Sequence, residues 1–236
     1  MTIREQVLAR IAANLRRAKP AATMTSHAHR VPVRAIVEQK VAAAKLDDRF
    51  AAELEAVAGH VHRCDDSSQA IASILELCHQ HQASRVLAWD ERFVGLPGLR
   101  STLSAHRIGY DTGWLPPEDG ARSERLRAME RIPVGVTGAI GAIAESGALA
   151  VVSGPGRPRL ASLLPPVHVA VLRADLIYAT LPDFLAAHPR IADEGSNFVL
   201  ITGPSRTADI EMTLTRGVHG PGEVHVILLQ ERKADG

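Results

Sequence analysis

The sequence has 236 residues, and its 27 Lys and Arg against 26 Asp and Glu give a formal net charge of +1. This balance gives no reason to expect a nucleic acid or an anionic membrane as partner, and 3% aromatic residues argue against base-stacking surfaces. Charges interrupt the amino terminus, and no apolar run reaches the roughly 20 residues that span a bilayer. We therefore expect a cytoplasmic protein.

The amino-terminal part of the chain has the spacing of helices. Apolar side chains at every fourth position predict an amphipathic helix over residues 2–18, and a proline-bounded stretch after it predicts an extended linker. A second helix is predicted over residues 33–59, which end in a glycine. We assign residues 1–58 to an amino-terminal helical segment with a linker and residues 59–236 to an α/β domain.

A strand–helix–strand pattern opens this domain. Residues 60–64 alternate as a short strand, residues 65–80 have acids and hydroxyls ahead of an apolar helix face, and residues 84–90 form a second strand. Such units build parallel sheets through right-handed crossovers. The sequence therefore predicts an α/β fold with a mostly parallel sheet, flanking helices and additional amino-terminal helices.

The second half of the chain is dense in short apolar stretches. Glycines recur between them, and Ser146-Gly147 is placed to form a tight hairpin between two strands. A further buried strand is predicted over residues 168–179, followed by a short helix. Residues 197–203 and 223–229 predict two more strands, and we expect a helix between them that begins near Ser205.

The predicted helix start at Ser205 is one candidate site. Its hydroxyls and the neighbouring Arg206 would lie beside free backbone N–H groups, an arrangement that binds a carboxylate or a phosphate. Asp209 and Glu211 would cap the helix, pair with Arg206 or hold a substrate hydroxyl. Ordinary capping without any ligand explains the same residues, so both interpretations stay open.

Glu145 is the second candidate, because it follows an apolar strand directly. An acid with such neighbours must face a cavity, a cation or water, since burying it unpaired costs several kcal/mol. It is a candidate nucleophile, a candidate general base or a charge at the edge of a hairpin.

Metal ligands are scattered over one segment. His60, His62 and Cys64 alternate along one strand, and Cys78, His79 and His81 end the next helix. Paired ligand spacings typical of structural zinc are absent, so we assign no metal. An iron–sulfur cluster normally needs four thiolates, and the chain has two cysteines.

The stretches "VTGAIGAIAESGALAVVSGPGRPRLASLLPPVHVAVL" and "NFVLITGPSRTADIEMTLTRGVHGPGEVHVILL" resemble the lactate-utilisation (LUD) domain in its stand-alone form. The resemblance implies a fold akin to that of sugar-phosphate isomerases and CoA transferases. It also implies a small anionic ligand, and the site residues that match the family's two motifs are Glu145, Ser146, Gly147, Thr202, Gly203, Ser205, Arg206, Thr207, Asp209 and Glu211.

The same resemblance implies a cluster-free component of a multi-subunit system that oxidises L-lactate to pyruvate, with iron–sulfur subunits as partners. Under this hypothesis the chain carries no cofactor, and the clusters belong to the partner subunits. The alternative is an independent CoA-transferase-like or sugar-phosphate-acting enzyme that uses Glu145. Whether the chain is itself catalytic is open at this point.

Overall fold

The computed structural model describes residues 3–17, 45–208, 214–216 and 220–230. The chain divides into two units, Met1–Gln39 and Lys40–Gly236. In the first, helix α1 (Ile3–Arg17) exposes Val7 and Leu8. No helix in the described part of the chain is long and apolar enough to cross a membrane.

The second unit is built on a six-stranded sheet in which all neighbouring strands are parallel. Its order is β1-β12-β7-β4-β2-β3. The bounds are β1 (His60–Cys64), β2 (Arg85–Ala88), β3 (Gly109–Asp111), β4 (Val134–Gly138), β7 (Val167–Arg173) and β12 (Glu223–Leu229). The predicted mostly parallel α/β fold is therefore confirmed.

A second sheet has the order β8-β5-β6-β9, and its pairs β5–β6 and β6–β9 are antiparallel. These strands are β5 (Gly141–Ile143), β6 (Ala148–Ser153), β8 (Ile177–Tyr178) and β9 (Asn197–Ile201). We predicted a single strand over residues 168–179, and the structure divides it between the two sheets. The 3-10 turn Ala174–Leu176 redirects the chain there, so β7 and β8 join different sheets.

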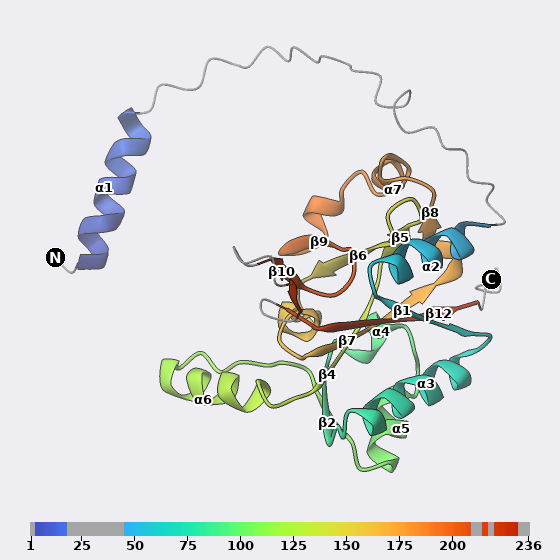
Figure 1. Cartoon of the computed structure of the whole chain (residues 1–236). Helices are drawn as coiled ribbons and strands as arrows, with labels where there is room; N and C mark the ends of the chain where they lie inside the picture. Colours follow the sequence, from blue (N-terminus) through green and yellow to red (C-terminus); the bar gives the residue numbers. More distant parts are fainter. Residues whose placement is uncertain (1–2, 18–44, 209–213, 217–219, 231–236) are drawn as a thin grey trace. The chain divides into compact units, whose positions relative to one another are not determined.

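Helices cover both faces of the six-stranded sheet. Figure 1 shows α3 and α5 together on one side, and α2 with the second sheet on the other. The helices of this unit are α2 (Leu46–Ala56), α3 (Ser67–Gln80), α4 (Glu91–Val94), α5 (Leu99–Ala105), α6 (Asp119–Met129) and α7 (Leu181–Ala187), with further 3-10 turns Arg159–Ser162 and Ile191–Asp193.

Helix α2 is part of the same core as the sheet. Phe50 and Leu54 are fully buried and join the cluster that also contains Trp89 and Val226. The domain boundary that we predicted between residues 58 and 59 separates α2 from this core. Burying two large apolar side chains contributes several kcal/mol to the docking of α2 on the sheet. Residues 33–44 of the helix predicted over residues 33–59 lie outside the described residues, and α2 ends at Ala56, short of the predicted end.

Helix α3 starts where the sequence predicts a cap. The Asp66 carboxylate accepts a hydrogen bond of 2.8 Å from the backbone N–H of Gln69, which satisfies one of the free donors of the first turn. Its apolar face buries Ile74, Leu77 and Cys78 against the sheet. The helix ends at Gln80, and His81 follows as its carboxyl-terminal cap.

Candidate functional site

The candidate segment that comes first in the chain, Glu145–Gly147, is the turn of the β5–β6 hairpin. The last antiparallel pair before the turn is Ile143 with Ala148, so the predicted hairpin is confirmed. Glu145 is half-buried, Ser146 is exposed and Gly147 is buried with a φ of 62°. Because L-residues other than glycine adopt this left-handed region at a cost, the backbone itself accounts for glycine at residue 147.

The carboxylate of Glu145 is engaged by the start of helix α7. Its Oε1 accepts a hydrogen bond of 3.0 Å from the backbone N–H of Leu181, the first residue of that helix. Thr180 accepts a second bond from the N–H of Asp183. Glu145 thus satisfies a helix donor and places negative charge at the positive end of the helix.

This contact predicts the effect of changing Glu145. Glu145→Ala should lower the free energy of unfolding by about 1 kcal/mol, because it removes a helix-capping acceptor. Glu145→Gln should lose only a few tenths of a kcal/mol, since its amide oxygen still accepts from Leu181. Urea unfolding measures both values, and Glu124→Ala on the exposed face of α6 is the matched control. Equal losses for the Ala and Gln variants would contradict the capping role.

The second candidate segment, residues 202–205, follows strand β9. Thr202 is exposed, Pro204 is buried and Gly203 has a φ of 108°. The backbone N–H of Ser205 donates a hydrogen bond of 2.8 Å to the carbonyl of Pro221. This bond joins the turn to the residues that lead into β12.

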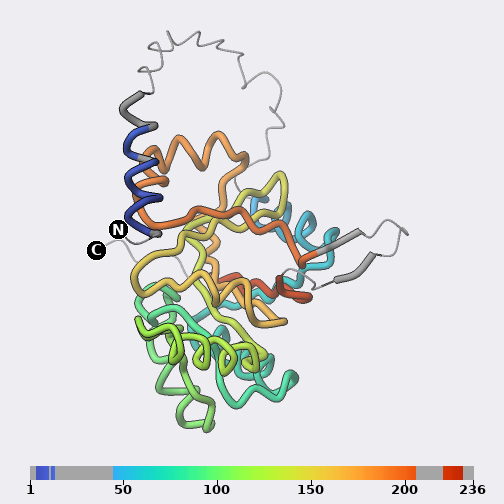
Figure 2. Tube along the Cα trace, turned by 90° about the vertical axis from the view of Figure 1, so that its left-hand side faces the viewer, coloured from blue at the N-terminus to red at the C-terminus, as the bar shows by residue number. Residues whose placement is uncertain are grey.

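The fold brings the two candidate turns together. Leu149 of β6 pairs with Ile201 of β9, so Ser146-Gly147 precedes and Thr202-Gly203 follows neighbouring positions at one end of the second sheet. Helix α2 and its cap Val57 lie against the two glycines. A Cβ added to Gly147 would lie 2.5 Å from the backbone N of Leu54. A Cβ on Gly203 would lie 2.7 Å from Cγ2 of Val57, just after α2. Figure 2 shows these segments side by side.

The predicted helix beginning near Ser205 is wrong. Arg206–Ala208 forms strand β10, which pairs antiparallel with β11 (Leu214–Arg216) in a two-stranded hairpin. Thr207 pairs with Thr215, and paired β-branched residues favour a hairpin over a helix. Within the described residues, Ser205 therefore precedes a strand and not a helix, and the anion site that depended on a helix start at Ser205 is withdrawn.

The remaining residues of the second motif are placed in part. The backbone of Arg206 and Thr207 belongs to β10, while Asp209 and Glu211 lie outside the described residues. Gly147 and Gly203 therefore lie against the end of α2, with Ser146 and Thr202 beside them in sequence. Glu145 instead contacts Leu181 at the start of α7, and Ser205 contacts Pro221.

The two cysteines lie in the core. Cys64 is 2% exposed and Cys78 is fully buried, and burial raises the pKa of the Cys78 thiol to about 12. A thiol with this pKa is protonated at neutral pH, whereas metal binding needs the thiolate. Among the described residues, the group close enough to hold a metal ion, His81, Glu223 and His225, contains neither cysteine.

Two of those histidines have neighbours that the sequence analysis missed. His62 and His81 approach His225 and Glu223, which come from a strand more than 140 positions further along the chain. The available signal was the alternation in "EVHVILL", which places Glu223 and His225 on one face of a strand.

Comparisons with known proteins agree with this fold. Residues 48–229 match the family model described as LUD domain. Lactate utilization protein C of Halalkalibacterium halodurans is 31% identical over 175 residues, which are 72% of each chain. The protein of the same name from Shouchella clausii is 31% identical over 170 residues, which cover 71% of this chain and 72% of the relative.

A solved structure gives an independent comparison of the fold. The crystal structure of a DUF162 family protein from Deinococcus radiodurans aligns with a TM-score of 0.59 at 18% identity. The alignment covers 80% of this chain and 99% of the other. At this identity the likeness supports the α/β architecture alone.

Proposed function

The chain belongs to the LUD domain family, and on this premise we propose that it acts in lactate utilisation as a non-redox component of a system that oxidises L-lactate to pyruvate. The observation that carries the proposal is the meeting of the two motif turns at the end of α2. These are the segments in which the sequence most resembles the family, and they converge although more than 50 residues separate them.

The proposal gives the turns a binding role. Ser146 and Thr202 are exposed at the same end of the second sheet, so their hydroxyls are accessible to a small carboxylate or to a partner subunit. The buried cysteines support a component that leaves the electron transfer to iron–sulfur partners. This division of labour accounts for a well-packed chain without a set of cysteine ligands of its own.

Deletion and complementation test this function. A strain that lacks the chain should fail to grow on L-lactate while it grows normally on glucose, and the full-length chain should restore growth and co-purify with iron–sulfur subunits. The double variant Ser146→Arg/Thr202→Arg should fold but not restore growth. Ser104→Arg, which changes an exposed residue of α5, is the control and should restore it. Normal growth of the deletion strain on L-lactate would refute the proposal.

The alternative is an independent CoA-transferase-like or sugar-phosphate-acting enzyme that uses Glu145 as nucleophile. The contact with Leu181 gives Glu145 a capping role that requires no such chemistry, although a carboxylate bonded through one oxygen can still attack through the other. A thermal-shift screen separates the two hypotheses. Sugar phosphates or CoA esters should raise the melting temperature if the chain is this independent enzyme, and no shift with either class would count against it.

A further inference from the structure

Histidines gather beside the amino-terminal ends of β1 and β12. The register pairs His60 with His225, so His60, His62 and His225 share one face of the six-stranded sheet. Glu223 lies two residues before His225 and therefore on the same face. Helix α3 packs over these strands, and its cap His81 reaches the same place.

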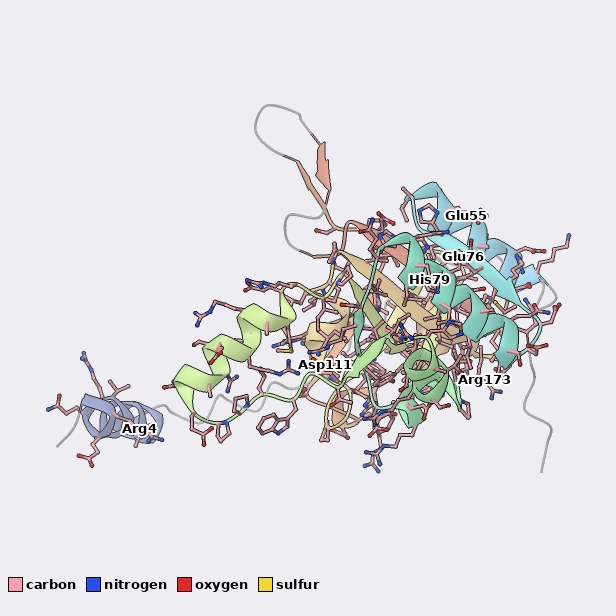
Figure 3. All side chains as sticks on the ribbon, turned by 90° about the horizontal axis from the view of Figure 1, so that it is seen from below. Arg4, Glu55, Glu76, His79, Asp111 and Arg173 are labelled. Atoms are coloured by element: carbon pink, nitrogen blue, oxygen red, sulfur yellow. The ribbon has the colours of Figure 1, made fainter. Side chains whose placement is uncertain are left out.

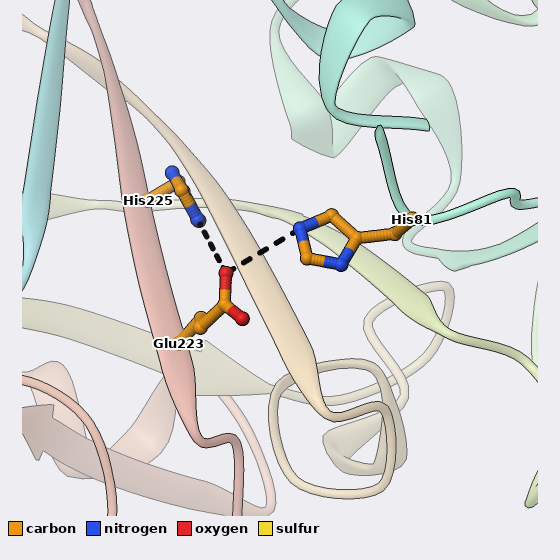
Figure 4. Close-up of side chains that lie close together, drawn as sticks. All are labelled: His81, Glu223 and His225. Carbon is orange, nitrogen blue, oxygen red and sulfur yellow. Dashed lines mark hydrogen bonds and ion pairs between the residues drawn. The ribbon is translucent and has the colours of Figure 1, made fainter. Parts of the chain in front are cut away.

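One carboxylate oxygen is the centre of this cluster. Oε2 of Glu223 lies 3.4 Å from Nε2 of His81 and 3.3 Å from Nε2 of His225, as Figure 4 shows. One ligand atom from each of the three residues can be chosen so that all lie within 4.8 Å of one another. Two ring nitrogens and a carboxylate therefore converge, although their residues come from two different elements of the fold.

These distances suit a small metal ion. Nitrogen and oxygen ligands at 2.0–2.2 Å from a tetrahedral zinc ion lie about 3.4 Å from one another. Two of the three separations are close to this value, and the third, between the two ring nitrogens, is within 4.8 Å. Two imidazoles and one carboxylate are also the donor set of open divalent metal sites, which leave a position for water or a substrate oxygen.

The two β12 residues of the cluster differ in their exposure. The side chain of His225 is 9% exposed. Glu223 is 47% exposed in its side chain, so an ion can enter from solvent at the carboxylate side.

His62 supports the ring of His225 from behind. Its Nε2 lies 3.0 Å from Nδ1 of His225, so one ring donates a hydrogen bond to the other. When the Nδ1–H of His225 donates to His62, the Nε2 lone pair of His225 faces Glu223. Partners of this kind fix the orientation and the tautomer of histidine ligands in metal sites.

We propose that His81, Glu223 and His225 bind a divalent transition-metal ion of the zinc class, with His62 positioning the ring of His225. The site lies close to the second motif turn, because Ser205 is bonded to Pro221, two residues before Glu223. The proposal does not depend on lactate utilisation, since metal binding is measured on the purified chain.

Cobalt and zinc titrations test the site directly. The full chain, freed of any histidine tag and dialysed against a chelator, is titrated with Co²⁺ at pH 7.5 and followed by its visible absorption. Zn²⁺ is then added as a competitor, and calorimetry gives the stoichiometry. We expect a single site with visible bands of four- or five-coordinate cobalt, which zinc abolishes, and a zinc-dependent rise in the melting temperature.

Four variants identify the ligands. His81→Asn and Glu223→Gln change partly exposed side chains, so the apo proteins should melt close to the wild type, and each should weaken zinc binding more than about 100-fold. His62→Gln should weaken it about 10-fold, as expected for a positioning residue. The control is His79→Asn, because His79 is exposed on α3 and its ring contacts His106 instead; it should bind zinc like the wild type. Figure 3 shows His79 on this helix.

The outcomes separate a metal site from a cluster held by ion pairs alone. Absence of a one-to-one cobalt or zinc complex in the wild type would overturn the proposal. The proposal would also be overturned if His81→Asn and Glu223→Gln bound the metal as tightly as the control His79→Asn. The metal would then be bound by other histidines.

Discussion

Gly147→Ala is expected to lower the free energy of unfolding by about 2–5 kcal/mol. About 1–2 kcal/mol of this comes from the left-handed conformation at φ 62°, and about 1–3 kcal/mol from overpacking. The new Cβ would lie 2.5 Å from the backbone N of Leu54 and 2.8 Å from the carbonyl carbon of Glu53. Because these are backbone atoms, no rotamer change relieves the contact, and α2 must shift.

The control for this prediction is Gly95→Ala. Gly95 also has a positive φ, of 80°, but a Cβ there meets no atom within 4 Å. This variant should lose only the conformational part, about 1–2 kcal/mol. Urea unfolding gives both values, and equal losses would show that α2 does not pack against the β5–β6 turn as described.

The contacts of Gly147 change the interpretation of the first motif, Glu145–Gly147. The sequence suggested that Glu145, Ser146 and Gly147 are ligand contacts, whereas the structure gives two of them packing or capping partners. Gly147 admits the backbone of α2, and Glu145 accepts from the start of α7. Of the three, the exposed Ser146 is the residue best placed to meet a ligand or a partner, which is why the growth test targets it.

Local signals were sufficient for much of the fold. The acids and hydroxyls before an apolar face predicted the start of α3, which Asp66 caps, and the Ser146-Gly147 pair predicted the β5–β6 hairpin. Both depend on hydrogen bonds and backbone angles within a few residues. The class of the fold followed from the alternation of strands and helices in the same way.

Local signals failed where distant partners decide the structure. Ser205 and the residues after it have the composition of a helix start, but Thr207 finds its partner in Thr215 and forms a hairpin. The histidine cluster has no motif spacing, because β12 inserts beside β1 only in the folded chain. A single sequence does not give the strand order β1-β12-β7, and so it does not bring His225 to His62.

A buried histidine should make the stability of the protein depend on pH. His168 on β7 is fully buried, and its Nε2 lies 2.9 Å from the hydroxyl oxygen of Thr137 on β4. Within the described structure its Nδ1 has no hydrogen-bond partner. Burial is the larger cause that lowers the pKa of His168 from 6.5 to about 4, and the nearby His225 adds to it.

The direction of this pH dependence follows from the number of protons that the folded and unfolded states bind. Between pH 6.5 and 4 the unfolded chain protonates this imidazole while the folded chain keeps it neutral, so the stabilisation is complete above pH 6.5 and is lost as the pH falls. The loss attributable to His168 should be about 3 kcal/mol at pH 4.

The double variant Thr137→Val/His168→Leu isolates this contribution. It replaces both partners of a buried hydrogen bond with apolar side chains, a change that leaves no polar group unpaired. His62 and His225 also have lowered pKa values and remain in both proteins, so their own share of the pH dependence is common to both curves, and the coupling of His225 to His168 is counted with His168. Urea unfolding between pH 7 and pH 4 should give a shallower decline for the variant than for the wild type. Parallel curves would mean that His168 is protonated in the folded state, and that the β4–β7 interior accommodates its charge.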